Sequence, residues 1–165
     1  MQLGGIIRSG DMDKPEFMEE RDMNEFSTTW AMALLRGISD NCSAKELDAC
    51  LKHCAECHYE ACGRGEMAAQ FAGDLAGFVH FLEEKFGIAI QVDYEAGKIL
   101  YDVNQNCCIC PMAEGYDGEL PKSLCECSRF FTERMFSEVL QRPAHTKLLR
   151  SWLRDKKSCL YEITI

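Results

Sequence analysis

Eleven cysteines are the residues with the most chemical potential in this chain of 165 residues. Nine of them fall in two groups, of which the first spans Cys50 to Cys62 and the second spans Cys107 to Cys127. Thiols this close in sequence act as metal ligands, redox partners or nucleophiles more often than isolated ones do. The function of the chain therefore depends first on what its sulfur atoms bind.

Two Cys-x-Cys pairs in the second group could converge on one metal ion. Four thiolates in a tetrahedron suit a structural zinc ion, and an iron–sulfur cluster also takes four. A Cys-x-Cys pair binds one ion only where the chain bends, and Pro111 favours such a bend. We expect zinc ahead of an iron–sulfur cluster, with buried reduced thiols or a disulfide as alternatives. The expected ligands are Cys108, Cys110, Cys125 and Cys127, with Cys107, Cys54 and Cys57 as further candidates.

The first group has the spacing of a helix face. Cys50, Cys54 and Cys57 recur at i, i+4 and i+7, so they lie on one side of a helix. Cysteine and histidine pairs at this spacing can chelate a metal. Because thiols are among the most buried side chains, we expect this face to be part of the core.

Two residues are candidates for catalysis. Cys62 lies beside Arg64, whose charge would favour the thiolate, and this makes Cys62 the candidate nucleophile. His80 is the candidate acid or base, with His58 as an alternative. The competing interpretation for Cys62 and His80 is ordinary packing in the core.

Helical patterns dominate the first half of the chain. Asp13 followed by Pro15 predicts a helix start, and the helix should end near Gly37. Ser43 and Glu46 have capping-box spacing and start a second helix that stops near Gly63. The first helix should bury a stripe made of Phe17, Phe26, Trp30 and Leu34.

A third helix is expected from about Gly65 to Phe86. Its apolar residues recur at helical spacing, and a ridge of small residues should pack closely against another helix or leave room for a ligand. The apolar residues are Phe71, Leu75, Phe78 and Leu82, and the ridge is Ala69, Gly73 and Gly77.

The second half of the chain alternates with period two, which indicates strands. Residues 88–94 and 99–103 form a hairpin around the turn E-A-G-K, and a helix follows at 124–140. Residues 145–153 and 158–165 form a second hairpin. One face of its last strand carries Cys159, Tyr161, Ile163 and Ile165.

These elements predict one α+β domain over residues 1–165. Its antiparallel sheet of four or slightly more strands comes from two hairpins and is covered by about four helices. Residues 1–12 are expected to be flexible, residues 13–86 to be helical, and residues 87–165 to carry the sheet, the cysteine site and a helix.

Charge and composition restrict the partners. A net charge of -9 opposes nonspecific binding to nucleic acids or anionic membranes. No apolar run is long enough to span a bilayer and no secretory signal is evident, so we expect a cytoplasmic protein. Residues 142–157 carry six Lys or Arg and one acid, and this basic strip faces either a small anionic ligand or an acidic neighbour such as a second subunit.

The last 60 or so residues resemble known bacterial families. The motifs are C-C-I-C-P, then L-P-K-S-L-C-E-C-S-R-F-F, M-F-S-E-V-L-Q-R-P and S-C-L-Y-E-I-T-I. They resemble the tails of 4-vinyl-reductase-type ligand-binding domains and are similar to L-2-amino-thiazoline-4-carboxylic acid hydrolase-like families. The resemblance implies an α+β domain with a pocket for a small organic molecule. The terminal turn departs from the pattern, because Arg154 to Lys157 stand where glycine is usual.

Two functions follow as expectations. The first is a noncatalytic small-molecule-binding domain with a zinc–cysteine site, in which Arg64, Arg150 or Arg154 meets an anionic ligand and the chain forms a homodimer. The second is a hydrolase acting on a C–N bond, in which Cys62 or a metal-bound water attacks and His80 moves protons.

Overall fold

The computed structural model describes residues 20–114, 116 and 118–165. The helix start expected at Asp13, the stripe residue Phe17 and the segment 1–12 lie outside this part of the chain. In chain order the helices are α1 Glu20–Asn41, α2 Ala44–Ala61, α3 Arg64–Ala69, α4 Leu75–Phe86, the 3-10 helix η1 Pro111–Ala113, α5 Leu124–Leu140 and α6 Trp152–Asp155.

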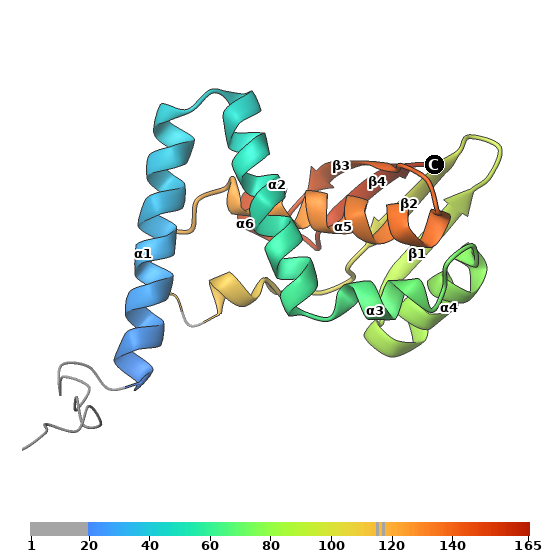
Figure 1. The fold of residues 1–165 in the computed structure, drawn as a ribbon, viewed down its shortest axis with the longest axis horizontal. Coiled ribbons are helices and arrows are strands. Elements are labelled where there is room, and N and C mark those ends of the chain that lie inside the picture. Colours follow the sequence, from blue (N-terminus) through green and yellow to red (C-terminus); the bar gives the residue numbers. More distant parts are fainter. Residues whose placement is uncertain (1–19, 115, 117) are drawn as a thin grey trace, which may run out of the picture.

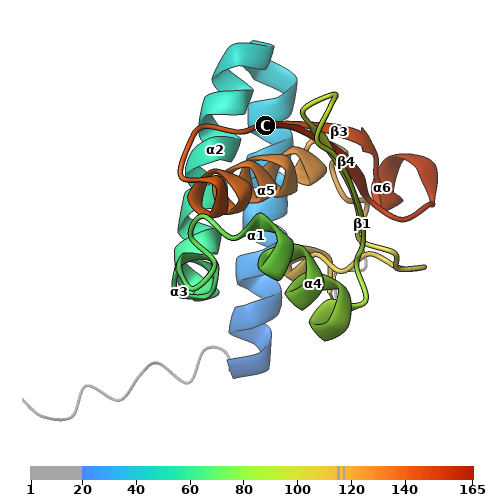
Figure 2. The same ribbon diagram turned by 90° about the vertical axis from the view of Figure 1, so that its right-hand side faces the viewer.

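Two hairpins build one antiparallel sheet, with the strand order β1-β2-β4-β3. Helices α2, α4 and α5 lie on one side of the sheet (Figures 1 and 2). The α+β class and the four-stranded sheet predicted from the sequence are therefore confirmed. The strands are β1 Ala89–Asp93, β2 Lys98–Asp102, β3 His145–Arg150 and β4 Leu160–Thr164.

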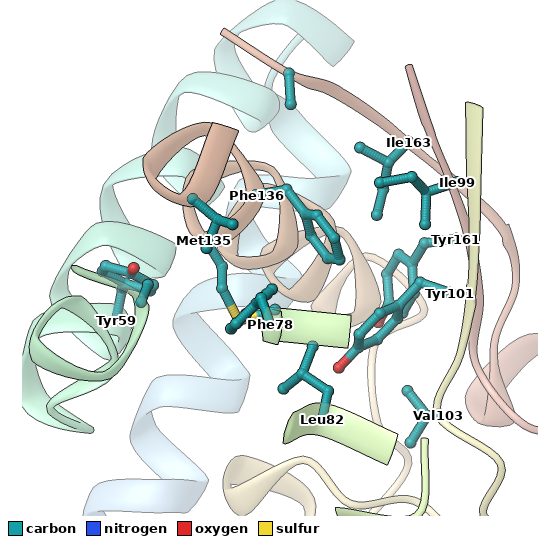
Figure 3. Close-up of a cluster of buried hydrophobic side chains, with 13 residues drawn as sticks. Tyr59, Phe78, Leu82, Ile99, Tyr101, Val103, Met135, Phe136, Tyr161 and Ile163 are labelled. Carbon is teal, nitrogen blue, oxygen red and sulfur yellow. The ribbon is translucent and has the colours of Figure 1, made fainter. Parts of the chain in front are cut away.

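The core lies between α5 and the inner face of the sheet. Phe136 of α5 is fully buried, and its ring meets Phe78 of α4 and Tyr101 of β2 edge-on at 5.6 and 5.8 Å (Figure 3). Tyr101 pairs with Tyr161 across the sheet, and Ile99 pairs with a buried isoleucine of β4 in the same way. Edge-on ring contacts add to the free energy gained by removing these side chains from water.

Local capping signals are confirmed where the sequence shows them. The side chain of Ser43 accepts from the backbone of Glu46, whose carboxylate in turn accepts from the Ser43 amide at 2.8 Å. Gly63 adopts a φ of 62° just after α2, in the left-handed region that glycine reaches without steric cost. Both ends of α2 are therefore encoded by local chemistry.

The single third helix is a wrong prediction, because the chain breaks into α3 and α4. Gly73 has a φ of 80°, and its amide donates to the Val139 carbonyl at 2.7 Å, so it leaves the helix to contact α5. The carboxylate of Asp74 then accepts from the Gly77 amide at 2.9 Å and starts α4. Ala69, Gly73 and Gly77 therefore form no continuous ridge.

The apolar stripe of the first helix is also not buried as predicted. α1 continues past Gly37 to Asn41 and buries Met32 on its inner side. Phe26, Trp30 and Leu34 are 55%, 60% and 49% exposed. Helical spacing located the stripe correctly but did not show whether another element covers it.

The second hairpin differs from the prediction at its turn. β3 ends at Arg150, and α6 occupies positions expected to be strand. Tyr161 and Ile163 are buried and Cys159 packs against the core, so the face predicted for the last strand is confirmed. No helix among the described residues has the length and apolar character needed to cross a membrane.

Candidate functional site

Cys110, Cys125 and Cys159 lie within electrostatic reach of Cys108, near one end of the sheet. Cys108 and Cys110 lie in the connection between β2 and α5, Cys125 lies in the first turn of α5, and Cys159 directly precedes β4. Burial is the main cause that raises the pKa values of Cys110, Cys125 and Cys159. A charge on Cys108 raises each of these pKa values further. The Val103 amide donates to the Cys159 carbonyl at 2.9 Å, which holds the connection against the last strand.

Helix geometry separates the two cysteines of the second Cys-x-Cys pair. Residues two apart on an α-helix point about 200° apart, so Cys125 and Cys127 face different sides of α5. Cys127 lies near Cys54 of α2 and also near Cys110, and burial raises its pKa to about 12, with both neighbours adding to the shift. Among the predicted ligands, Cys127 therefore faces a different side of α5 from Cys125 and lies near Cys54 of α2.

Cys110 directly precedes η1, and the Ala113 amide donates to the Cys110 carbonyl at 2.9 Å. The amides of Met112 and Ala113 also act on the thiol and lower its pKa. Pro111 keeps Cys110 extended, with a ψ of 122°, so that the chain turns directly after it. Burial raises the pKa of Cys110, and the two amides partly oppose this, because an N–H donor stabilises a thiolate.

The segment around α6 supplies donors to the other two thiols. The Ser151 hydroxyl and the Leu153 amide hydrogen bond to Cys125, and the Trp152 amide hydrogen bonds to Cys159. Ser151 is fully buried. Burial still raises the pKa of both thiols, so they are neutral in the structure at neutral pH.

Sequence reasoning placed Cys159 in the last strand but did not include it among the metal candidates. The alternation of Cys159 with Tyr161 along the strand showed that Cys159 faces inward. Its proximity to Cys108, however, depends on the pairing of β2 with β4 in the sheet. No group of three or more His, Cys, Asp or Glu side chains within residues 20–114, 116 and 118–165 is arranged to hold a metal ion. The four thiols are therefore coupled electrostatically through Cys108 but are not arranged around one point.

The first cysteine group is exposed, which contradicts its predicted place in the core. Cys50, Cys54 and Cys57 are all exposed, and so is Cys107 of the second group. The buried face of α2 consists instead of Leu51, Ala55 and Tyr59. Leu51 and Tyr59 are larger apolar side chains than cysteine and gain more from leaving water, so the face that carries them is the one that packs against the core.

The two residues expected to act in catalysis both lie at the surface. Cys62 is the exposed C-cap of α2. The imidazole Nε2 of His80 lies 3.4 Å from a carboxylate oxygen of Glu84, and both side chains are 70% exposed. His58 packs on Phe131 with ring centroids 4.8 Å apart, and burial followed by the charge of Arg64 lowers its pKa.

The three arginines expected to bind an anion have partners within the chain. Arg150 pairs with Asp102 and donates to the Ser158 carbonyl at 2.9 Å. The guanidinium of Arg64 lies 4.8 Å from the centre of the Phe86 ring. Arg154 pairs with Glu126 and also hydrogen bonds to Ser151 and Leu148.

The described surface includes two open depressions. The larger, about 680 Å³, lies on the outer face of the sheet beside Asp93, Lys98 and Glu162. The smaller, about 450 Å³, lies between α2, α3 and α5 and is bordered by Tyr59 and Arg134. None of the three predicted arginines lines either depression.

Comparison of the chain with protein-family models, curated proteins and solved structures finds no match. The resemblance of the C-terminal third to the 4-vinyl-reductase and thiazoline-carboxylate hydrolase families stays a prediction. The same holds for the ligand-binding roles of the arginines and for the catalytic roles of Cys62 and His80.

Proposed function

We propose that this domain is a metal-binding module in which Cys108, Cys110, Cys125 and Cys159 hold one zinc ion. One observation supports this more than any other. A charge on Cys108 acts on the thiols of Cys110, Cys125 and Cys159, which come from segments far apart in the sequence, and backbone amides near these three thiols oppose the rise in pKa that burial causes. Amide donors around cysteine sulfur stabilise the thiolate, which is the form that binds metal.

Zinc suits the donor set better than a hard cation does. Thiolates are soft ligands, and four of them match the tetrahedral preference of a structural zinc ion. Because burial raises the pKa of Cys110, Cys125 and Cys159, binding at neutral pH must release protons from these thiols. The side chains must also turn about their Cα–Cβ bonds, since they do not converge in the structure.

The proposed role of the ion is structural. Four protein ligands leave zinc without the open position that catalysis needs. Between β2 and α5 the chain runs through residues 103–123, and the regular structure described there is the short helix η1. Structureless connections of this length are uncommon in compact domains. A zinc ion on Cys108 and Cys110 would anchor this connection to α5 and to the last strand.

Metal analysis of the reduced, purified chain tests the proposal. We expect about one zinc per chain in the wild type. Cys159→Ser should lose the metal and lower the melting temperature, because it removes a proposed ligand. Cys127→Ser is the matched control, since Cys127 is also partly buried on α5 yet faces Cys54, and it should keep the metal.

Three results would contradict the proposal. The first is metal-free protein after reduction and incubation with zinc. The second is loss of metal in Cys127→Ser together with retention in Cys159→Ser. The third is a brown, iron-containing preparation with a visible absorption band, which would assign the thiols to an iron–sulfur cluster instead.

A further inference from the structure

Helix α2 carries a face of exposed thiols that the proposed zinc site does not use. Cys50, Cys54 and Cys57 recur at i, i+4 and i+7, and all three are exposed. Because successive helical residues are turned by about 100°, the three side chains share a sector of about 60° on the helix surface. Cysteine is among the side chains most often buried in folded proteins. Packing in the core therefore does not explain this face.

The rest of α2 holds these thiols at fixed positions. Leu51, Ala55 and Tyr59 on the inner side of the helix are buried. A carboxylate oxygen of Asp48 lies 3.1 Å from a guanidinium nitrogen of Arg129 in α5. Ligands on a packed helix keep their spacing better than ligands on a loop. The outer face of α2 is thus a rigid row of sulfur atoms.

The spacing of the thiols suits a shared ion and not a disulfide. Side chains three or four residues apart on a helix have Cβ atoms about 5–6 Å apart, as in the pairs Cys50–Cys54 and Cys54–Cys57. A disulfide requires Cβ atoms about 3.8 Å apart, which would distort the helix. An ion with a metal–sulfur bond of about 2.3 Å on each side spans the wider gap.

Cys54 belongs to both pairs. Cys50 and Cys57 are separated by about 10 Å along the helix axis, which is too far for both sulfur atoms to bind the same ion. The face therefore offers two overlapping sites, each made of two thiols. No group of three or more ligating side chains converges within residues 20–114, 116 and 118–165, but a site of two thiolates does not need one.

We propose that this face binds one Cu(I) ion, held by Cys54 together with either Cys50 or Cys57. Thiolates are soft ligands that select Cu(I), and two of them satisfy this ion. A structural zinc ion takes four ligands, and hard cations take oxygen ligands, so neither fits a pair of thiols. On binding, each of the two thiols releases its proton to solvent, two copper–sulfur bonds form, and the copper stays in its Cu(I) state.

Exposure makes the bound ion exchangeable. A thiolate from outside can reach copper on the surface of α2, because all three cysteines are exposed. The ion can also pass from Cys50–Cys54 to Cys54–Cys57 by exchanging one sulfur ligand while Cys54 stays bound. These properties favour the uptake and release of Cu(I) over its permanent retention.

Anaerobic titration of the reduced, full-length chain with Cu(I), in competition with a coloured Cu(I) chelator, tests the site. Wild type should bind one more equivalent than Cys54→Ser, because this variant lacks both pairs. Cys50→Ser and Cys57→Ser should each lower the affinity by only about twofold, the statistical effect of losing one of two equivalent pairs. The double variant of these two positions should behave like Cys54→Ser.

Cys62→Ser is the matched control, since it removes another exposed thiol at the end of α2 and should bind Cu(I) as wild type does. Circular dichroism should show every variant folded. The four thiols of the proposed zinc site are present in all of these variants, so the comparison does not depend on zinc.

Three results would overturn the proposal. The first is equal Cu(I) binding by wild type and Cys54→Ser, and the second is retention of the ion by the double variant. The third is a loss in Cys127→Ser that equals the loss in Cys54→Ser. It would place the ion between α2 and α5, where Cys127 lies near Cys54, and not on the exposed face.

Discussion

Raising the pH should reveal Cys127 as a partly buried, neutral thiol. Burial, with Cys54 and Cys110 adding to it, raises the pKa of Cys127 to about 12 in the folded chain, whereas an exposed thiol ionises at about 8.5. Above that lower value the unfolded chain loses the proton and the folded chain keeps it, so unfolding becomes more favourable. The contribution of Cys127 to stability is complete below about pH 8.5 and is lost as the pH rises toward 12.

The magnitude follows from the gap between the two pKa values. One pKa unit corresponds to about 1.4 kcal/mol, so at pH 10 the full effect on the free energy of unfolding would be about 2 kcal/mol. Cys127 is only partly buried, and solvent screening reduces this figure. We expect a loss of about 1 kcal/mol from this thiol between pH 7.5 and pH 10.

Urea unfolding of metal-free wild type and Cys127→Ser across this pH range measures the effect. The serine hydroxyl does not titrate there, so the variant should lose about 1 kcal/mol less than wild type as the pH rises. Lysine and tyrosine titrations are common to both chains and cancel in the difference. Cys62→Ser, which removes an exposed thiol, should follow wild type. An identical pH dependence in wild type and Cys127→Ser would refute the reasoning.

Two further substitutions test the core directly. Phe136→Ala should lower the free energy of unfolding by about 3–5 kcal/mol, because Phe136 is fully buried between Phe78 and Tyr101, and chemical denaturation would contradict this with a loss below about 1 kcal/mol. Tyr59→Phe should cost about 1 kcal/mol by removing a 2.9 Å hydrogen bond to Glu138. A double-mutant cycle with Glu138→Ala, which removes the acceptor, measures that coupling, and additive effects of the two changes would show that the bond contributes nothing.

Errors in the sequence predictions share one physical origin. Phe26, Trp30 and Leu34 have the spacing of a packed stripe, and Cys50 and Cys54 have the spacing of a core face, yet all five are exposed. Periodicity shows which side chains share a side of a helix. It does not show which side meets another element, because that depends on contacts between residues distant in the chain.

Local signals were sufficient for the fold class and for most of the secondary structure, but not for the break between α3 and α4 or for α6. The capping box at Ser43, the left-handed Gly63 and the alternation along β2 and β4 each act within a few residues, and each is found as predicted. Gly73 was wrongly predicted to lie inside a helix. Its φ is left-handed and its amide donates to the carbonyl of Val139, a residue far along the sequence that no local signal reveals.

The amino-acid sequence by itself determined that this protein is an α+β domain with a cysteine group at the junction of hairpin and helix. Only the tertiary structure decided which thiols meet. Cys125 and Cys127 are near in sequence, but helix geometry turns them about 200° apart. Cys159 is remote from Cys108 in sequence, but β4 lies beside β2 in the sheet and brings the two thiols within electrostatic reach of each other. Proximity along a chain is a local property, whereas a shared site depends on where the strands pair and where the helices face.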